Sequence, residues 1–309
     1  MRSAPSVTAV ILNYNVSEYT VACVRSLQRT TYPSLKILVV DNASTDDSLE
    51  RLSMVLSGIE LRSTGRNKGY TGGVNAGLRW ARETEPDYIL VLNPDTEVQA
   101  DFLDHLVGGL EAYPQAAAAC GTIYSYHQPT EIWYAGGRMI AWRGLAIHQD
   151  KGSCKPPEAL GGPRSVSFVT GCMVLYRVSA LDRIGMQDER FFLYLDDIEM
   201  SARIARKGFE LLYVPKAVIH HHVEGEKINP FKVYYSVRNR LLLIRTAFSG
   251  PVRIVAVAYF MSVIVMKMFV WMVSNRRFLR AAAMGLEDSF RGRFGEGRGL
   301  QTFAPRGSA

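Results

Sequence analysis

Carboxylate and amide side chains follow three apolar runs of the sequence, and these groups could bind a charged ligand. The run "VTAVILN" ends at Asn13, and "LKILVVD" ends at Asp41. A third run, "YILVLNPD", ends at Asn93 and Asp95. Buried parallel strands read as continuous apolar runs, and ligands bind beyond their carboxyl ends. We therefore expect Asp95 to face a cleft.

The "NPD" turn offers oxygen ligands for a hard cation. Asn93 and Asp95 lie two residues apart, and Mg²⁺ or Mn²⁺ prefers carboxylate and carbonyl oxygens. With only these two protein ligands, a cation is expected to bind well only when a diphosphate is present. The turn after the first strand, "NYNVSEY", has no glycine to bring bare backbone against a pyrophosphate, since the first glycine is Gly58, and the sequence holds no GK[ST] phosphate loop. The alternative is an ordinary proline-containing turn.

Asp41 and the glycine-rich segment 65–77 are candidates for nucleoside binding. Asp41 could accept hydrogen bonds from a base or a ribose, although an Asp at this point is often only a turn residue. The segment "GRNKGYTGGVNAG" holds Asn67 and Lys68 among glycines. Its free N–H groups could approach a nucleotide closely, whereas as a plain loop it needs no ligand.

Two adjacent acids in "FFLYLDDIE" stand at an expected helix start behind aromatic residues. We interpret Asp196 as the N-cap, since one acid suffices for capping. Asp197 is then the candidate general base, aimed at a cleft. Capping alone, with no catalytic role, is the alternative.

Three consecutive histidines, His220 to His222, follow the apolar stretch "YVPKAVI". A strand would send His220 and His222 to one face and His221 to the other. A histidine near a strand end is more often structural than a ligand, but Asp95 needs a partner of this kind to hold a cation.

The elements expected to position these residues alternate along the chain. Apolar strands are followed by amphipathic stretches such as "STDDSLERLSMVL" and "VNAGLRWARE". This order indicates an α/β unit with a parallel sheet. The four cysteines are widely spaced with no CxxC pair, which argues against a zinc ribbon and suits a reducing compartment.

The basic charge is concentrated in the C-terminal part. Residues 227–309 carry 14 Lys and Arg against 3 Asp and Glu, so they hold +11 while residues 1–226 hold −4 of the total of +7. The stretch 254–273 is apolar except for Lys267 and has the ~20-residue length of a membrane helix. It could span a bilayer, lie in its plane, or be buried in a homodimer. Basic flanks favour contact of 251–280 with an anionic membrane surface, in-plane rather than spanning.

Nucleic acid is not an expected partner, because the basic segment is interleaved with membrane-grade apolar residues and carries no recognised nucleic-acid-binding motif. The stretch 290–299, "FRGRFGEGRG", is expected to be flexible.

The ordered motifs resemble those of family 2 glycosyltransferases with the GT-A fold. "AVILNYN", "VVDNASTDDS", "NKGYTGGVNAG", "LVLNPDT", "VTGCMVLYR", "FFLYLDDIEMSARIARKG" and the histidine run occur in the order typical of that family, over residues 7 to about 245. More narrowly, the chain resembles bacterial rhamnosyltransferase-type enzymes that build cell-surface polysaccharides.

The resemblance implies a mostly parallel sheet flanked by helices. The GT-A catalytic domain would cover 1–226, with a nucleotide-binding half over about 1–120 and an acceptor half over 121–226. Residues 227–309 would form a helical, basic, membrane-associating extension. The enzyme would work at the cytoplasmic face of the plasma membrane, as a peripheral or monotopic protein.

The resemblance also implies inverting transfer from a nucleoside-diphosphate sugar, with dTDP-rhamnose as one candidate, to a glycan or a polyprenyl-diphosphate-linked glycan. Glucose, galactose and N-acetylhexosamine donors stay open, as does a retaining route. Asp197 matches the family's base, with Asp196 in place of a Glu. Asp95 takes the last position of the DxD metal motif and Asn93 the first. The remaining implied contacts are Asn13, Asp41, Asn67 and Lys68 with the nucleotide, and His221 with Mg²⁺ or Mn²⁺.

An inactive sugar-nucleotide-binding protein of the same fold is the alternative function, and the intact Asp197 counts against it.

Overall fold

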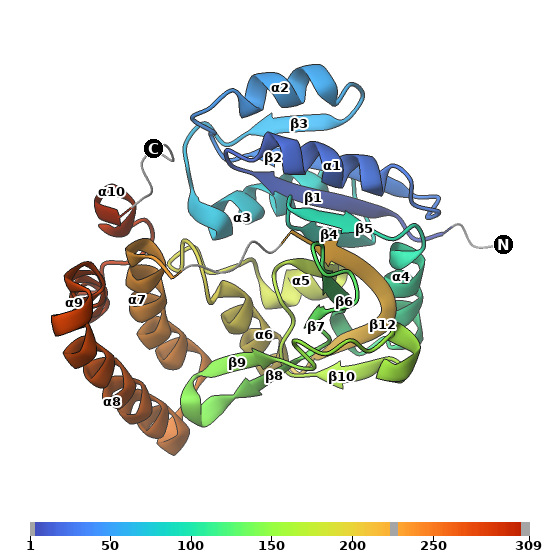
Figure 1. The fold of residues 1–309 in the computed structure, drawn as a ribbon. Helices are drawn as coiled ribbons and strands as arrows, with labels where there is room; N and C mark the ends of the chain where they lie inside the picture. The colour runs from blue at the N-terminus through green and yellow to red at the C-terminus, as the bar shows by residue number, and fades with distance from the viewer. Residues whose placement is uncertain (1–3, 223–227, 304–309) are drawn as a thin grey trace.

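Four parallel strands form the N-terminal half of the central sheet in the computed structural model, which describes residues 4–222 and 228–303 (Figure 1). They are β1 (Val7–Asn13), β2 (Leu35–Asp41), β3 (Glu60–Ser63) and β4 (Tyr88–Leu92), in the order β3-β2-β1-β4. All seven residues of β1 are buried, as a strand covered on both faces requires. The register pairs Asn13 with Asp41, so the polar ends of β1 and β2 lie side by side.

The second half of the sheet is mixed. The strand β11 (Met173–Arg177) runs antiparallel to both β4 and β6 (Ala116–Ser125), and β6 pairs in parallel with β12 (Glu210–His221). Three short strands add to these: β5 (Thr96–Val98) and β10 (Arg164–Val166) pair with β12, and β7 (Ile132–Tyr134) pairs with β6. In the β5–β12 register His221 pairs with Thr96, which brings this histidine beside Asp95.

Helices cover the two faces of the sheet, which confirms the expected α/β class. They are α1 (Ser17–Leu27), α2 (Ser48–Val55), α3 (Gly69–Arg82), α4 (Phe102–Ala112), α5 (Val178–Ile184) and α6 (Asp196–Arg206). The glycine-rich segment is helical from Gly69 onward, and two of its glycines serve packing rather than an open loop. A Cβ on Gly77 would lie 2.3 Å from Val10, and one on Gly73 would lie 2.5 Å from Leu12. Bare backbone lets α3 lie close on β1.

The C-terminal third is helical, as predicted. It consists of α7 (Pro230–Ala247), α8 (Gly250–Ser274), α9 (Arg276–Phe290) and α10 (Gly299–Phe303), which together are called the C-terminal arm. Figure 1 shows α7, α8 and α9 on one side of the molecule, away from β1, β2 and β3. The strands β8 (Gly137–Ile140) and β9 (Leu145–His148) form a small hairpin near the C-terminal arm. The short turn η1 (Ala141–Arg143), which connects these two strands, packs against α8. A second short turn is η2 (Pro157–Leu160). The predicted domain boundary at 226/227 lies outside the described residues.

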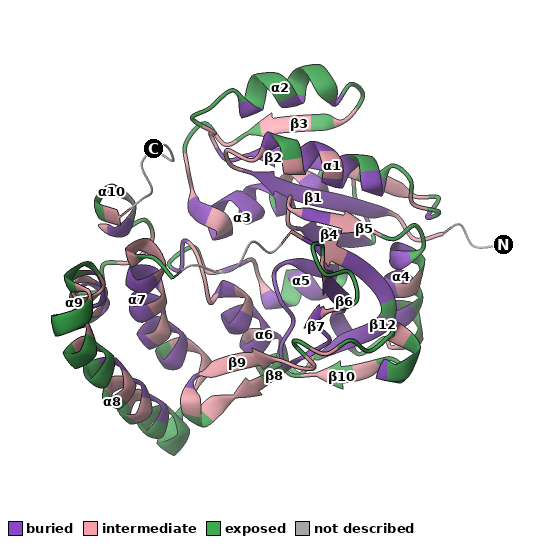
Figure 2. Ribbon diagram, viewed as in Figure 1, coloured by how far each residue is buried: buried purple, intermediate pink, exposed green. Residues whose placement is uncertain are grey.

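Burial differs sharply between the sheet and the arm (Figure 2). The sheet strands are mostly buried, whereas α8 buries only Ala256, Phe260 and Ile264 despite its apolar sequence. The expectation of a flexible stretch at 290–299 is wrong. Tyr235 donates to the carbonyl of Glu296 at 2.6 Å, and Gly295 N donates to the carbonyl of Arg190 at 2.8 Å, so this stretch packs against the body.

Candidate active site

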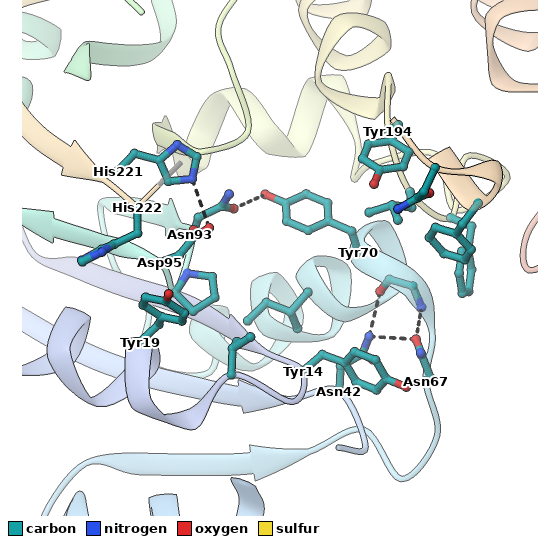
Figure 3. Close-up of a pocket in the computed structure, with 18 of the residues that line it drawn as sticks. Tyr14, Tyr19, Asn42, Asn67, Tyr70, Asn93, Asp95, Tyr194, His221 and His222 are labelled. Atoms are coloured by element: carbon teal, nitrogen blue, oxygen red, sulfur yellow. Dashed lines mark hydrogen bonds and ion pairs between the residues drawn. The ribbon is translucent and has the colours of Figure 1, made fainter. Parts of the chain in front are cut away.

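A cavity of about 790 Å³ lies at the carboxyl ends of β1 and β4, where the architecture places a ligand (Figure 3). Its polar lining includes Asn42, Asn67, Asn93, Asp95 and His221. Figure 3 shows the Asp95–His221 pair at one end and the Asn42–Asn67 pair at the other, with Tyr70 between them. The cleft expected in front of Asp95 is therefore present.

Asp95 and His221 form a close pair at one end of this cavity. Asp95 Oδ2 lies 3.2 Å from His221 Nε2, and the two side chains are 34% and 10% exposed. The backbone N–H of His222 donates to the carbonyl of Asp95 at 2.8 Å, which fixes the two strands' ends together. Burial lowers the pKa of the His221 imidazole, but Cys172 and Asp95 raise it more, to about 10.

Asp95 and His221 suit a cation that has few protein ligands and binds together with its substrate. Within residues 4–222 and 228–303 no group of three His, Cys, Asp or Glu could hold an ion. Asp95 Oδ1 is nevertheless buried without a hydrogen-bond partner among the described residues. Neighbouring ligands of an octahedral ion at about 2.1 Å stand about 3 Å apart. The 3.2 Å between Asp95 and His221 is close to that spacing.

The other end of the cavity is built around the amide of Asn42. Its Nδ2 donates to Asn67 Oδ1 at 3.1 Å and to the carbonyl of Gly69 at 3.1 Å. Its Oδ1 accepts from the backbone N–H of Lys68 at 3.1 Å. Asn42 thus holds the turn that opens α3. Asn67 lines the cavity, while the Lys68 side chain is not among the groups that line it.

Asn13 and Asp41 do not line the cavity, although they end the strands that form its floor. Both are fully buried. Asn13 Nδ2 donates to Asp41 Oδ1 at 2.9 Å, and Ser44 Oγ donates to the same oxygen at 2.6 Å. Thr20 Oγ1 donates to Asn13 Oδ1 at 2.7 Å. Direct contact of either residue with a base or ribose, which stays a prediction, would require the Ser44 turn to move.

Asp196 and Asp197 begin α6 outside the residues that line the cavity. The interpretation of Asp196 as N-cap is wrong, because the N-cap is Leu195 and no side chain caps the helix. Asp196 is instead buried inside the first turn, with Oδ2 unpartnered among the described residues. Burial raises its pKa well above the usual range, and the neighbouring Asp197 adds to that.

Asp197 is partly exposed, and Gly171 links it to Tyr70, which lines the cavity. Its Oδ2 accepts from the N–H of Gly171 at 3.2 Å, and the carbonyl of Gly171 accepts from Tyr70 at 2.8 Å. The Tyr70 hydroxyl also lies 3.4 Å from Asn93 Oδ1. Burial raises the pKa of Asp197 to about 6 against the opposing hydrogen bonds from Gly171 and Ile198. Such a carboxylate is poised for proton transfer near neutral pH.

The sequence matches the family described as "Glycosyl transferase family 2" over residues 8–185, more than half of the chain and including Asp95. The chain belongs to this family of glycosyltransferases. One similar protein is the N-acetylglucosaminyl-diphospho-decaprenol L-rhamnosyltransferase of Mycobacterium tuberculosis, 27% identical over 237 residues, which cover 69% of this chain and 75% of that protein. The resemblance to rhamnosyltransferases is confirmed.

Two solved structures share the fold of this glycosyltransferase. GalNAc-T7 with UDP, GalNAc and Mn²⁺ has a TM-score of 0.61 at 16% identity, covering 79% of this chain and 48% of that one. The mannosyltransferase PcManGT of Pyrobaculum calidifontis, in complex with GDP-Man and Mn²⁺, has a TM-score of 0.54 at 16% identity, covering 94% and 76%. The GT-A fold is therefore confirmed.

Sequence reasoning missed several residues of the glycosyltransferase cavity. Tyr70 lies in the glycine-rich segment 65–77, three residues after Asn67, but no role was predicted for it. An aromatic residue among the glycines was the signal that could have identified it. Trp133, with its ring 4.8 Å from that of His221, comes from β7. Phe231 comes from α7, beyond the expected catalytic domain. No local pattern marks the last two, because only the fold brings them to the cavity.

The expected alternation of the histidines holds only in part. His221 and His222 both line the cavity of the glycosyltransferase, because β12 ends at His221 and the strand periodicity stops there. His222 Nε2 lies 3.3 Å from Glu97 Oε1, and its ring stacks on Tyr126. Of the two, His221 is the one whose side chain contacts the Asp95 carboxylate.

Proposed function

We propose that this glycosyltransferase transfers a sugar with inversion from a nucleoside diphosphate to a hydroxyl of a glycan or lipid-linked glycan. The observation that carries the proposal is the single cavity that joins the Asp95–His221 pair to the Asn42–Asn67 end. A nucleoside at the amide end would bring its diphosphate to the carboxylate end. Rhamnose on dTDP is the first donor to test, since the M. tuberculosis relative is named as an L-rhamnosyltransferase.

Asp95 and His221 would hold the cation, and Asn93 stands next to them. Mg²⁺ or Mn²⁺ bound there would supply charge stabilisation for the departing diphosphate. Both Mn²⁺-bound structures of the same fold support this assignment. Asn67, held by Asn42, would orient the nucleoside, with Asn13 and Asp41 buttressing the strand ends beneath it.

Asp197 would accept the proton of the acceptor hydroxyl at the edge formed by Gly171 and Tyr70. The hydroxyl oxygen then forms a bond to the anomeric carbon while the bond from that carbon to the diphosphate oxygen breaks. The proton ends on Asp197 and the electron pair on the diphosphate. Asp196 would stay protonated next to Asp197, so that the two adjacent carboxyl groups carry one negative charge and not two.

The C-terminal arm would bring this site to a membrane-borne acceptor at the cytoplasmic face. The helix α8 is long enough to cross a bilayer. Its most apolar 18-residue window has a mean hydropathy of 2.1, yet only 17% of that window is buried. Arg253 precedes its apolar stretch, and the α9 residues Arg276, Arg277 and Arg280 follow it. Trp142 of the neighbouring η1 turn is 52% exposed beside the same helix. An in-plane helix with basic flanks suits an anionic lipid surface.

The proposal is tested with purified full-length protein and a panel of dTDP-, UDP- and GDP-sugars, with Mn²⁺ or Mg²⁺ present. Donor consumption should be selective and should require the cation. Asp197→Asn should retain donor binding while turnover falls by about 10³-fold or more. Donor binding without any turnover in the wild-type protein would instead favour an inactive sugar-nucleotide-binding protein.

A further inference from the structure

The segment that forms one wall of the cavity has an unfavourable backbone. Phe192, Tyr194 and Leu195 have φ angles of 62°, 69° and 67°. Side chains with a Cβ rarely adopt this left-handed region, and such residues persist only where the surroundings hold them. Three of them within four positions need a strong restraint close by.

Asn239 of α7 supplies that restraint from a fully buried position. Its Nδ2 donates to the carbonyls of Phe191 at 2.8 Å, Leu193 at 2.7 Å and Tyr194 at 3.1 Å. One amide group thus contacts three carbonyls of the same short segment. Backbone groups that the turn leaves unpaired are satisfied from another element.

Arg238 holds both the amide and the segment in place. Its Nε donates to Asn239 Oδ1 at 2.9 Å, and a terminal nitrogen donates to the carbonyl of Phe191 at 3.0 Å. Another donates to the carbonyl of Gly295 at 2.7 Å. Arg238 is fully buried, and these contacts join its guanidinium to the segment and to Asn239. Burying a charge is costly, and here the carbonyl groups and the rings of Tyr234 and Tyr235, whose centroids lie 5.5 and 4.7 Å from the guanidinium carbon, stabilise it.

The restrained segment connects the two parts of the site. Phe192 and Leu193 line the cavity, and the carbonyl of Phe192 accepts from Thr71 N at 3.3 Å, at the start of α3. At its other end, the carbonyl of Leu195 accepts from the N–H of Glu199 in the first turn of α6. A shift of the segment would therefore move both the nucleotide end and Asp197.

We propose that Asn239 and Arg238 are positioning residues, which hold the strained segment 191–195 so that the cavity wall and the start of α6 keep their places. The reacting groups remain those of the catalytic half, and α7 of the C-terminal region sets their geometry. The functional consequence rests on the proposed role of Asp197, whereas the restraint itself does not.

The test uses the full-length protein with Asn239→Leu, which keeps the size of the side chain and removes every donor, and Asn239→Ser, which keeps one donor. Backbone amide hydrogen exchange over 190–197 should become faster in both, with β1 and β4 unchanged. The value of kcat should fall by about 100-fold in the Leu variant, as for a displacement near 1 Å, and by less in the Ser variant. The acid limb of the pH profile should move to lower pH, because Asp197 becomes more hydrated.

Thr122→Val is the matched control. Thr122 is also fully buried, and it hydrogen-bonds to Tyr213 at 2.6 Å and to the carbonyl of Pro215 at 2.8 Å, away from the segment. It should change folded yield without changing exchange at 190–197 or the pH profile. Wild-type exchange at 190–197 in either Asn239 variant would overturn the proposal, and the Ser variant decides if the Leu variant does not fold. Turnover retained by Asp197→Asn would overturn the proposed function instead, while the exchange result would still decide the restraint.

Discussion

Asp197 accepts a hydrogen bond from the backbone N–H of Gly171 at 3.2 Å, and this contact ties the candidate base to the residue that also holds Tyr70. The carbonyl of the same residue, Gly171, accepts a hydrogen bond from the Tyr70 hydroxyl at 2.8 Å. The acid at the start of α6 and the tyrosine between the two ends of the cavity are therefore held by one backbone segment. Through Gly171, the candidate base Asp197 is connected to Tyr70 in the cavity.

Activity should depend on the ionisation of Asp197. Burial raises the pKa of this carboxyl to about 6, and only the ionised form can accept a proton. Below that pH, kcat/KM should fall about tenfold per pH unit, and above it the profile should be flat toward pH 8. Initial rates with saturating cation from pH 5 to 8 measure this. A profile that stays flat down to pH 5 would exclude Asp197 as the base.

A negative charge on Asp196 should not be needed for activity. Burial and the adjacent Asp197 raise its pKa, so ionisation is resisted in the folded protein. The folded-state value exceeds the unfolded one, so the wild-type protein loses stability as the pH rises from about 4 toward the folded-state pKa. Asp196→Asn avoids that loss.

The Asp196→Asn variant should keep turnover within about tenfold of wild type, in contrast to Asp197→Asn. Thermal unfolding should show a larger gain in stability at pH 8 than at pH 5. A loss of turnover as deep as that of Asp197→Asn would mean that Asp196 itself carries a catalytic charge.

Gly69 should tolerate no side chain. Its φ is +68°, and an added Cβ would lie 2.5 Å from the ring and the carbonyl of Phe192. Gly69→Ala should cost about 1–3 kcal/mol in the free energy of unfolding and weaken donor binding, because the cavity wall must shift. Gly108→Ala is the control, since nothing lies within 4 Å of its Cβ position on α4. It should be neutral or stabilise the helix by up to about 1 kcal/mol. Equal effects of both changes would contradict the steric account.

Membrane contact should depend on the basic start of α9. Neutralising Arg276, Arg277 and Arg280 to Gln should weaken binding to anionic vesicles by about 1 kcal/mol per charge at low salt. Vesicle co-sedimentation with and without anionic lipid measures this. The control removes Arg25, Arg29 and Lys36, three exposed cations of the opposite half. Unchanged binding in the α9 variant would argue against an in-plane membrane helix.

The strand ends could be predicted from sequence because each is an apolar run that stops on a polar residue. The burial of Asn13 and Asp41 could not, since their side chains are enclosed by Thr20 of α1 and by the turn at Ser44 that follows β2. Asp95 and His221 were paired through the resemblance, while their contact follows from the β5–β12 register. The role of Asn239 has no local signal, because its three partners lie more than forty residues earlier in the chain.

The most direct test of the central claim is the binding of a nucleoside diphosphate, measured by calorimetry with Mn²⁺ and with a chelator, for wild type and Asp95→Asn. Binding by the wild-type protein should be at least about tenfold tighter with Mn²⁺, since a cation held by Asp95 would stabilise the charge of the diphosphate. Asp95→Asn should lose most of that difference and keep the weaker, cation-free affinity. Cation-dependent binding that is unchanged in Asp95→Asn would contradict the account.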